Sequence, residues 1–272
     1  MSDFYGLIGE KLEHSISPNI HELILKELNS KGIYNLFEIK KENLRQAIKG
    51  LNALGAKGIN VTIPYKVEVM LSLDEISKEA RLIGAVNTID FQGEKLIGYN
   101  TDYHGFGQCL KREEVDIYNK SAVILGTGGA SKAIVQYLVD NGVKDITYVT
   151  RDTSKVSDNI KCFNVIAYKA THDLRNKDII INCTPCGMHP YIENSPVKKD
   201  ILSNFSTVVD LIYNPKETLF LKEAKDVGIK AINGLYMLVA QAVAAQEIWH
   251  KTKIREEITE QIFQKFNSYF GQ

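Results

Sequence analysis

The sequence predicts an α/β protein made of two α/β units followed by C-terminal helices. Over roughly the first hundred residues, short apolar strands alternate with helical patterns. A second alternation begins at Ser121 with an apolar strand, a glycine-rich loop and a helix. A helical pattern then runs from Leu235 to Phe270. Because each alternation has to bury its own strands, we expect two sheets covered by helices.

In the first unit, apolar periodicity predicts strands, helices and a hairpin. The first helix shows apolar residues such as Ile20 and Ile24 at helical spacing. The hairpin follows from Gly93, which stands between two strand patterns. Strands are expected at Phe4–Gly9, Tyr34–Ile39, Gly58–Ile63, Val86–Phe91 and Lys95–Tyr99, and helices at Pro18–Leu28, Leu44–Leu54 and in the stretch that ends at Ile83.

In the second unit, apolar runs bounded by loops predict buried parallel strands. The late segment YMLVAQAVAAQEIW is apolar on most of its surface, so we expect a buried helix with Met237 and Trp249 in the core. Strands are expected at Ile146–Val149, Asp178–Asn182 and Thr207–Leu211, after the strand at Ser121 and a helix at Ala130–Val139.

Composition indicates a partner of low molecular weight. The 272 residues are 44% hydrophobic, which is enough to fill real cores. Lys+Arg and Asp+Glu are 33 each, so no net charge favours nucleic acid or an acidic membrane. The first residues lack a signal-peptide pattern, and no apolar stretch is long enough to span a bilayer. We therefore expect a cytoplasmic protein that binds a small molecule, neither nucleic acid nor a membrane.

The four cysteines do not suggest a disulfide framework, in agreement with a reducing compartment. Cys183 and Cys186 form a C-x-x-C pair, and His189 follows shortly after. A zinc site needs about four ligands, and no second pair of this kind occurs. The sequence therefore favours small loop residues over a redox or zinc centre, and we expect no metal.

A glycine-rich loop marks a dinucleotide site in the second unit. The segment GTGGAS contains Gly126, Gly128, Gly129 and Ser131, follows an apolar strand and opens a helix. Glycines let the backbone turn tightly and approach a pyrophosphate at the positive end of the helix. The alternative is a structural turn between strand and helix.

The end of the next strand favours NADP over NAD. Arg151 can stack on adenine and pair with a 2′-phosphate, Thr150 adds a hydroxyl, and Lys155 supplies a second positive charge. Asp152 keeps NAD open, because a shift of one residue would direct its carboxylate at the ribose. Taken alone, Arg151 is also compatible with a solvated surface charge.

Polar side chains gather at the strand ends of the first unit. Taken singly, each has a structural interpretation as a helix cap, a turn residue or a solvated charge. Together they supply hydroxyls, an amide, an ammonium and a carboxylate, a set that suits a polyhydroxylated acid, and Lys66 is a candidate acid/base. The residues are Ser15, Ser17, Thr62, Lys66, Asn87 and Asp102.

The sequence resembles the shikimate dehydrogenase family in eight short segments, which are spread over nearly its whole length and stand in family order. The matching segments are SISPNIH, NVTIPYK, GAVNT, GYNTD, GTGGAS, NCTPCGM, DLIYNPKET and GLYMLVAQA. The resemblance implies reversible NADPH-dependent reduction of 3-dehydroshikimate to shikimate, a step towards chorismate and the aromatic amino acids.

The resemblance also implies a role for individual residues. Lys66 and Asp102 form the catalytic pair, Ser15 and Ser17 bind the substrate carboxylate, and Tyr213 approaches it. Thr62, Asn87, Asp102 and Gln241 hold the hydroxyls, and Gly234 and Met237 border the nicotinamide. The implied NADP site consists of Gly126, Gly128, Gly129, Ala130, Ser131, Thr150, Arg151, Lys155, Thr184, Leu211, Gly234 and Met237.

The implied fold has an N-terminal substrate domain, residues 1–101, completed by C-terminal helices within 236–272. A Rossmann-type NADP-binding domain, residues 102–235, lies between them in the sequence. The family includes monomers and homodimers.

Departures from the family pattern are few. Glu22 follows His21 in place of asparagine, Thr150 precedes the arginine, and Cys183 and Cys186 stand where small residues are usual. Two rival interpretations remain. One is a quinate/shikimate dehydrogenase that uses NAD(H), and the other is a dinucleotide-binding regulator without turnover.

Overall fold

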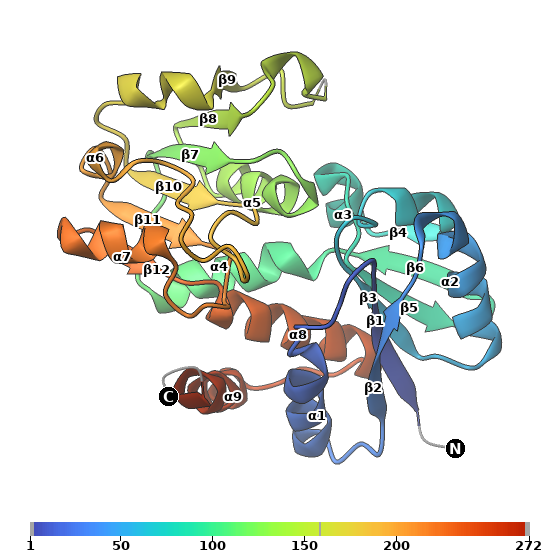
Figure 1. The fold of residues 1–272 in the computed structure, drawn as a ribbon. Helices are drawn as coiled ribbons and strands as arrows, with labels where there is room; N and C mark the ends of the chain where they lie inside the picture. Colours follow the sequence, from blue (N-terminus) through green and yellow to red (C-terminus); the bar gives the residue numbers. More distant parts are fainter. Residues whose placement is uncertain (1–2, 158, 270–272) are drawn as a thin grey trace. The chain divides into compact units, whose positions relative to one another are not determined.

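Figure 1 shows the fold of the computed structural model, which describes residues 3–157 and 159–269. Contacts divide the chain into two compact units. The first contains the described residues up to Gly105 and Val239–Phe266, and the second contains Phe106–Leu238 and the described residues from Asn267 on. The predicted domain ranges include residues 1, 2 and 158 and a C-terminal end from Phe270, which lie outside the described residues. The roles assigned to the two ranges stay predictions.

The first unit contains a mixed six-stranded sheet in the order β2-β1-β3-β5-β6-β4. β1 runs parallel to β2 and β3, whereas β5 is antiparallel to β3 and to β6. The strands are β1 (Phe4–Gly9), β2 (Ile33–Glu38), β3 (Gly58–Val61), β4 (Glu75–Ile76), β5 (Thr88–Gln92) and β6 (Lys95–Tyr99).

Helices cover both faces of this sheet (Figure 1). Neighbouring residues of β1 point to opposite faces, and both faces carry apolar side chains that have to be buried. Leu7 packs in a cluster with Leu25 and Trp249, whereas Ile8 packs in another with Ile48. The helices are α1 (Ser17–Glu27), α2 (Leu44–Ala53), α3 (Lys78–Ile83), α8 (Leu235–His250) and α9 (Glu256–Tyr269), with 3₁₀ turns η1 (Lys41–Asn43) and η2 (Glu68–Ser72).

Trp249 fixes α8 against the first sheet. Its Nε1 donates a hydrogen bond of 2.9 Å to the carbonyl of Ile89 in β5. Its ring lies so close to β3 that a Cβ added at Gly58 would be 2.0 Å from Nε1. Glycine therefore allows the indole to approach the strand, which explains why the strand that leads into the NVTIPYK segment begins with this residue.

The second unit contains a parallel six-stranded sheet in the order β12-β11-β10-β7-β8-β9. Counted from β7, this is the 3-2-1-4-5-6 order of a doubly wound dinucleotide-binding fold. The strands are β7 (Ser121–Leu125), β8 (Asp145–Thr150), β9 (Asn164–Ala167), β10 (Ile179–Asn182), β11 (Thr207–Asp210) and β12 (Lys230–Ile232).

Helices also cover the second sheet (Figure 1). Phe220 of α7 and Leu202 of α6 pack with Val123, Ile180 and Val208 in one core cluster. The helices are α4 (Thr101–Arg112), which begins in the first unit, α5 (Gly129–Asp140), α6 (Lys199–Leu202) and α7 (Leu219–Asp226), with η3 (Thr153–Lys155) and η4 (Tyr168–Asp173).

The predicted strands, the hairpin and the helices α1, α2 and α5 are confirmed, with boundaries shifted by a few residues. The expected C-terminal helices are confirmed as α8 and α9, and the break between them, which was not predicted, begins at Lys251, where the backbone is left-handed with φ 51°. β4, β9 and β12 were not predicted, since they are short and only partly buried. Among helices formed by described residues, none is both long and apolar enough to cross a membrane.

Candidate functional site

Lys66 and Asp102 form a nearly buried ion pair in the first unit. Lys66 Nζ donates to Asp102 Oδ2 at 2.5 Å, and the two side chains are 12% and 8% exposed. Desolvating two charges costs several kcal/mol per ion, so such a pair contributes little net stability. Its presence is better explained by chemistry that needs a positioned ammonium.

The loop after β3 places Lys66. Tyr65 is fully buried and its hydroxyl donates to the carbonyl of Ile39 at 2.6 Å. The Lys66 carbonyl accepts the backbone N–H of Val86 at 2.7 Å. The lysine is therefore held on both sides, by a buried neighbour and by the segment that leads into β5.

Asn87 and Thr101 join this pair to the predicted substrate residues. Asn87 Nδ2 donates to Asp102 Oδ1 at 2.9 Å and to Thr101 Oγ1 at 3.1 Å. Thr101 Oγ1 also lies 3.3 Å from Gln241 Oε1 on α8. Asp102 itself lies in the first turn of α4, where backbone N–H groups favour a carboxylate. The structure thus brings together Lys66, Asn87, Asp102 and Gln241.

A second layer of buried polar groups lies behind Asn87, and no separate signal in the sequence pointed to it. Tyr34 donates to Asn60 Oδ1 at 2.8 Å, and Asn60 Nδ2 donates to Thr88 Oγ1 at 3.0 Å. Thr88 Oγ1 in turn donates to Asn87 Oδ1 at 3.0 Å. Asn60 and Thr88 stand inside the NVTIPYK and GAVNT segments, so their nearness to the predicted site residues was the available clue.

Ser15, Ser17 and Thr62 lie in segments that follow β1 and β3. These strands are parallel neighbours, so their carboxyl ends meet at the same edge of the sheet. The Ser17 backbone N–H donates to Ser15 Oγ at 3.3 Å, which places the two serines side by side. In the described chain, no hydrogen bond joins these three side chains to the Lys66–Asp102 pair. Their shared edge of the sheet is the reason to group them with it.

In the second unit, the glycine loop leads from β7 into α5 as predicted. Gly126 has a φ of 96°, and its N–H donates to the carbonyl of Val149 at 3.0 Å. Gly128 is the N-cap residue of α5, and a Cβ there would meet nothing within 4 Å. Ser131 is buried and donates to the Gly128 carbonyl at 2.8 Å. The loop leaves space at the positive end of α5, which suits a pyrophosphate.

The segment after β8 contains Arg151 and Asp152, the two residues that bear on the choice between NADP and NAD. Asp152 is the N-cap residue of η3 and accepts from Ser154 N at 3.0 Å and Ser154 Oγ at 2.6 Å. These hydrogen bonds, with Lys155 beside it, lower the pKa of Asp152. Its carboxylate is therefore engaged in a local turn. By contrast, Arg151 is exposed and makes neither a hydrogen bond nor an ion pair within the described part of the chain.

Lys155, the second predicted cation, pairs with Asp152 at 3.2 Å, and its side chain is 83% exposed. Exposed pairs of this kind contribute about 0–1 kcal/mol, so the ammonium can exchange partners at little cost. With Arg151, this end of β8 offers positive charge to a phosphate, and the fit to NADP is better than to the unphosphorylated dinucleotide.

Thr184 and Leu211 follow β10 and β11 at the same edge as the glycine loop. A Cβ at Gly126 would lie 2.7 Å from Thr184 Cγ2, so the Thr184 loop packs directly on the glycine turn. Leu211 N donates to the Asn182 carbonyl at 3.1 Å. Gly234 N donates to the Ile212 carbonyl at 3.0 Å, which fixes the start of α8 beside the same loop. Parallel strands thus gather the predicted cofactor residues at their carboxyl ends.

Comparisons with known proteins identify the family. Residues 7–89 match the family model described as the shikimate dehydrogenase substrate binding domain, and residues 109–235 match the model described as shikimate / quinate 5-dehydrogenase. The shikimate dehydrogenase (NADP(+)) of Clostridium beijerinckii is 46% identical over 269 residues, covering 98% of this chain and 99% of the relative. The chain belongs to the shikimate dehydrogenase family.

Solved structures of the shikimate dehydrogenase family agree with this fold. A chorismate mutase/shikimate 5-dehydrogenase fusion protein from Clostridium acetobutylicum is 51% identical, with a TM-score of 0.97 and 100% of each chain covered. Shikimate 5-dehydrogenase from Thermus thermophilus, in complex with NADP(H) and shikimate, is 28% identical, with a TM-score of 0.86 and coverage of 97% and 99%. The predicted two-unit α/β fold is confirmed.

Other predicted family residues lie in the second unit. Tyr213 follows β11, Ala130 lies in the first turn of α5, and Met237 is buried near the start of α8. In the first unit Glu22, a departure from the family pattern, forms an exposed ion pair with Lys26 at 2.7 Å on α1. The individual roles carried over from the family stay predictions.

The C-x-x-C pair has an environment that suits protonated thiols. All four cysteines are free. Burial raises the pKa of Cys183 far above its ordinary value and also raises that of Cys186, with the charge of Asp210 adding to both. Neither thiol is therefore activated as a nucleophile. Within the described ranges, no group of His, Cys, Asp and Glu side chains is arranged to hold a metal ion.

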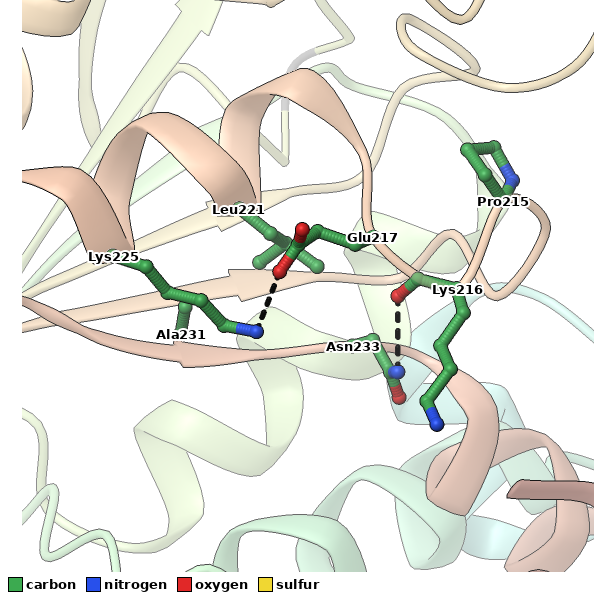
Figure 2. Close-up of a pocket in the computed structure, with 7 residues that line it drawn as sticks. All are labelled: Pro215, Lys216, Glu217, Leu221, Lys225, Ala231 and Asn233. Atoms are coloured by element: carbon green, nitrogen blue, oxygen red, sulfur yellow. Dashed lines mark hydrogen bonds and ion pairs between the residues drawn. The ribbon is translucent and has the colours of Figure 1, made fainter. Parts of the chain in front are cut away.

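A pocket of about 460 Å³ lies in the second unit, and none of the residues that line it is a predicted site residue (Figure 2). Its charged groups have partners within the unit. Lys225 Nζ lies 2.6 Å from Glu217 Oε1, and Lys216 Nζ donates to the Asn267 carbonyl at 3.0 Å. The lining residues are Pro215, Lys216, Glu217, Leu221, Lys225, Ala231 and Asn233.

Replacing Gly126 with alanine is expected to destabilise the second unit. A left-handed backbone costs a non-glycine residue about 1–2 kcal/mol, and the new Cβ would also press on Thr184. Gly128→Ala is the matched control, since its φ is −77° and its Cβ meets nothing within 4 Å. Denaturant unfolding should show a loss for Gly126→Ala alone. Equal stabilities would mean that the turn relaxes freely.

Replacing Asp210 with asparagine is expected to change how stability depends on pH. Burial raises the pKa of Asp210 to about 6 from 3.8. A raised carboxyl pKa gives stability that is fully present below the unfolded value and is lost as pH rises through about 6. The wild type should therefore lose about 2 kcal/mol relative to Asp210→Asn between pH 4 and pH 7. Parallel unfolding curves for both proteins across this range would contradict the assignment.

Proposed function

We propose that this protein is an NADP-dependent shikimate dehydrogenase, which reversibly reduces 3-dehydroshikimate to shikimate on the route to chorismate and the aromatic amino acids. The observation that carries the proposal is the Lys66–Asp102 pair at 2.5 Å within a buried polar cluster. A pair of this kind supplies a positioned proton donor, which reduction of a ketone requires.

Lys66 is the proposed proton donor. When a carbonyl is reduced, negative charge develops on its oxygen, and a positioned ammonium both stabilises that charge and delivers the proton. Asp102 holds Lys66 Nζ through Oδ2 and is itself held by Asn87 through Oδ1. The ammonium is therefore oriented before substrate arrives. In the direction of shikimate oxidation, the same nitrogen takes the hydroxyl proton back.

The substrate would be held by the groups that the family pattern names. Ser15 and Ser17 would bind its carboxylate with Tyr213, and Thr62, Asn87, Asp102 and Gln241 its hydroxyls. The link from Asn87 through Thr101 to Gln241 supports the last group, because one network then orients several hydrogen-bonding partners. Orientation of the ketone by such contacts supplies the remaining rate enhancement.

NADPH, when bound, supplies the hydride. The glycine loop from Gly126 to Ser131 would hold its pyrophosphate at the N-terminus of α5, and Arg151 with Lys155 would hold the 2′-phosphate. Thr150 would add a hydroxyl contact there. Gly234 and Met237 would border the nicotinamide, and Thr184 and Leu211 would complete the cofactor site. Two features fit the cofactor. A Cβ at Gly128 would meet nothing within 4 Å, and the Arg151 guanidinium makes no ion pair in the described part of the chain.

The division of labour between the units follows the same proposal. Residues 1–101, with helices within 236–272, would bind the substrate, and residues 102–235 would bind NADP. We further propose a cytoplasmic monomer or homodimer. Free thiols suit a reducing compartment, and sedimentation velocity distinguishes the two assembly states.

Product analysis tests the proposed activity. Purified protein incubated with 3-dehydroshikimate and NADPH should consume reduced nicotinamide and yield shikimate, identified by mass spectrometry and NMR. A non-catalytic regulator would bind the dinucleotide and leave 3-dehydroshikimate unchanged, and that result would overturn the proposal.

A further inference from the structure

Asp210 is a buried carboxylate in the second unit to which the proposed reaction assigns no role. It is the last residue of β11 and is 0% exposed. Oδ1 accepts from Asn182 Nδ2 at 3.0 Å and from Ile212 N at 3.1 Å, and Oδ2 accepts from Thr218 Oγ1 at 2.7 Å. A buried carboxylate held only by neutral donors costs free energy, so its presence calls for a role other than stability.

Through Asn182, the carboxylate fixes the loop after β10. Asn182 pairs with Asp210 across the sheet, and its Nδ2 also donates to the Cys186 carbonyl at 3.2 Å. Its Oδ1 accepts from Thr184 N at 3.0 Å and Thr184 Oγ1 at 2.7 Å. Every hydrogen-bonding group of the amide is thus committed, and its orientation follows from Asp210. Thr184, which packs on Gly126, is held by this amide.

Through its other contacts, the carboxylate fixes the loop after β11. The Ile212 N–H bond turns the chain directly after Leu211. Thr218 is the N-cap residue of α7, is fully buried, and accepts from Leu221 N at 3.3 Å. One side chain therefore fastens both loops that carry Thr184 and Leu211 at the edge where the dinucleotide is proposed to bind.

We propose that Asp210 is a positioning residue of the NADP site, which as a carboxylate holds the loops after β10 and β11 in the binding arrangement. The inference rests on the proposed function. Three donors directed at two oxygens demand the ionised form, whereas an amide or a protonated acid must turn one donor of its own towards them.

The ionisation of Asp210 gives this role a measurable signature. Burial raises its pKa to about 6, so the arrangement should loosen as pH falls through that value. The titratable groups that feel its charge are the thiols of Cys183 and Cys186, which raised pKa values keep neutral over this range. A contact that served stability alone would make unfolding depend on pH but would leave the ratio of NADP⁺ affinities of wild type and variant constant.

The test is calorimetric titration of NADP⁺ into the wild type and Asp210→Asn at pH 8 and pH 5. At pH 8 the variant should bind about 10- to 100-fold more weakly, the usual loss for hydrogen bonds to a charged group. At pH 5 the ratio of the two dissociation constants should approach one, because Asp210 is then largely protonated. The readout is the ratio of the dissociation constants of variant and wild type at each pH. The 2′-phosphate of NADP⁺ titrates in the same range, but it affects both proteins equally and cancels in the ratio.

Thr218→Val is the second variant, and it tests the same hydrogen-bond network while Asp210 itself stays in place. It removes the donor to Oδ2 and should also weaken NADP⁺ binding at pH 8. Thr171→Val is its control, because Thr171 is a buried threonine of the same unit that donates to the Tyr168 carbonyl at 2.7 Å. It should leave the dissociation constant unchanged.

Unchanged NADP⁺ affinity in Asp210→Asn and Thr218→Val at pH 8 would overturn the inference. A ratio that stays constant between pH 5 and pH 8, or weakened binding that merely follows a fall in Tm, would overturn it as well. Failure of the proposed function is distinguishable, because then the wild type itself would not oxidise shikimate, whether or not it binds NADP⁺.

Discussion

Replacing Lys66 with alanine is expected to lower kcat for shikimate oxidation by at least about a hundredfold, the usual contribution of a positioned acid/base group. The KM for shikimate should change much less, because the ammonium acts mainly on charge that develops in the transition state. Steady-state rates with saturating NADP⁺ measure both constants. An unchanged kcat would remove Lys66 from the mechanism.

The control for Lys66 is Lys95→Ala. Lys95 lies in the same unit and also forms an ion pair, at 2.6 Å to Glu75, but its side chain is 48% exposed. It should keep wild-type kcat and KM. Because Lys66→Ala leaves Asp102 buried without its cation, a stability loss of about 3–5 kcal/mol is expected too. The rates should therefore be compared at a temperature where circular dichroism shows both variants folded.

Replacing Arg151 with alanine is expected to raise the KM for NADP⁺ by about 10- to 100-fold and to leave that for NAD⁺ nearly unchanged, since a charge-assisted contact to the 2′-phosphate is lost. The physical reason is the position of Arg151 directly after β8 and its lack of any ion pair in the described part of the chain. Initial rates with each cofactor at saturating shikimate measure the two effects.

Arg175→Ala serves as the matched control for Arg151. Arg175 is also exposed and in the second unit, but it precedes β10 and therefore lies towards the amino edge of the sheet. It should leave both cofactor constants unchanged. Equal losses for NADP⁺ and NAD⁺ in Arg151→Ala would mean that the guanidinium does not bind the 2′-phosphate.

Most of the fold was predictable because buried strands and helices show clear patterns of apolar residues in the sequence. β3 and β10 are mostly apolar, and all their residues are buried. The failures have local causes. β12 has only Lys230–Ile232 and begins with an exposed lysine. The end of α8 depends on the left-handed backbone of Lys251, and a lysine does not by itself predict that conformation.

The site was predictable to the extent that its residues stand in motifs. Lys66, Asn87 and Asp102 were expected together, and the structure joins them by hydrogen bonds. The supporting groups were not expected, because their contacts depend on strand register. Asn182 meets Asp210 only through the pairing of β10 with β11, and a shift of one residue would turn each side chain to the other face.

The choice of cofactor was left open by Asp152 and became clearer through a local hydrogen bond. From the sequence, its carboxylate could reach a ribose if the register shifted by one residue, just as the guanidinium of Arg151 could reach a phosphate. The structure engages Asp152 with Ser154 at the start of η3. Side-chain capping of this kind is decided by backbone geometry over a few residues, which composition and periodicity do not specify.

The most direct test is a two-by-two assay of shikimate or quinate with NADP⁺ or NAD⁺, followed by the absorbance of reduced nicotinamide. The account predicts the highest kcat/KM for shikimate with NADP⁺, with quinate and NAD⁺ both far poorer. Turnover of quinate with NAD⁺ that matched shikimate with NADP⁺ would contradict it and would favour the quinate/shikimate alternative.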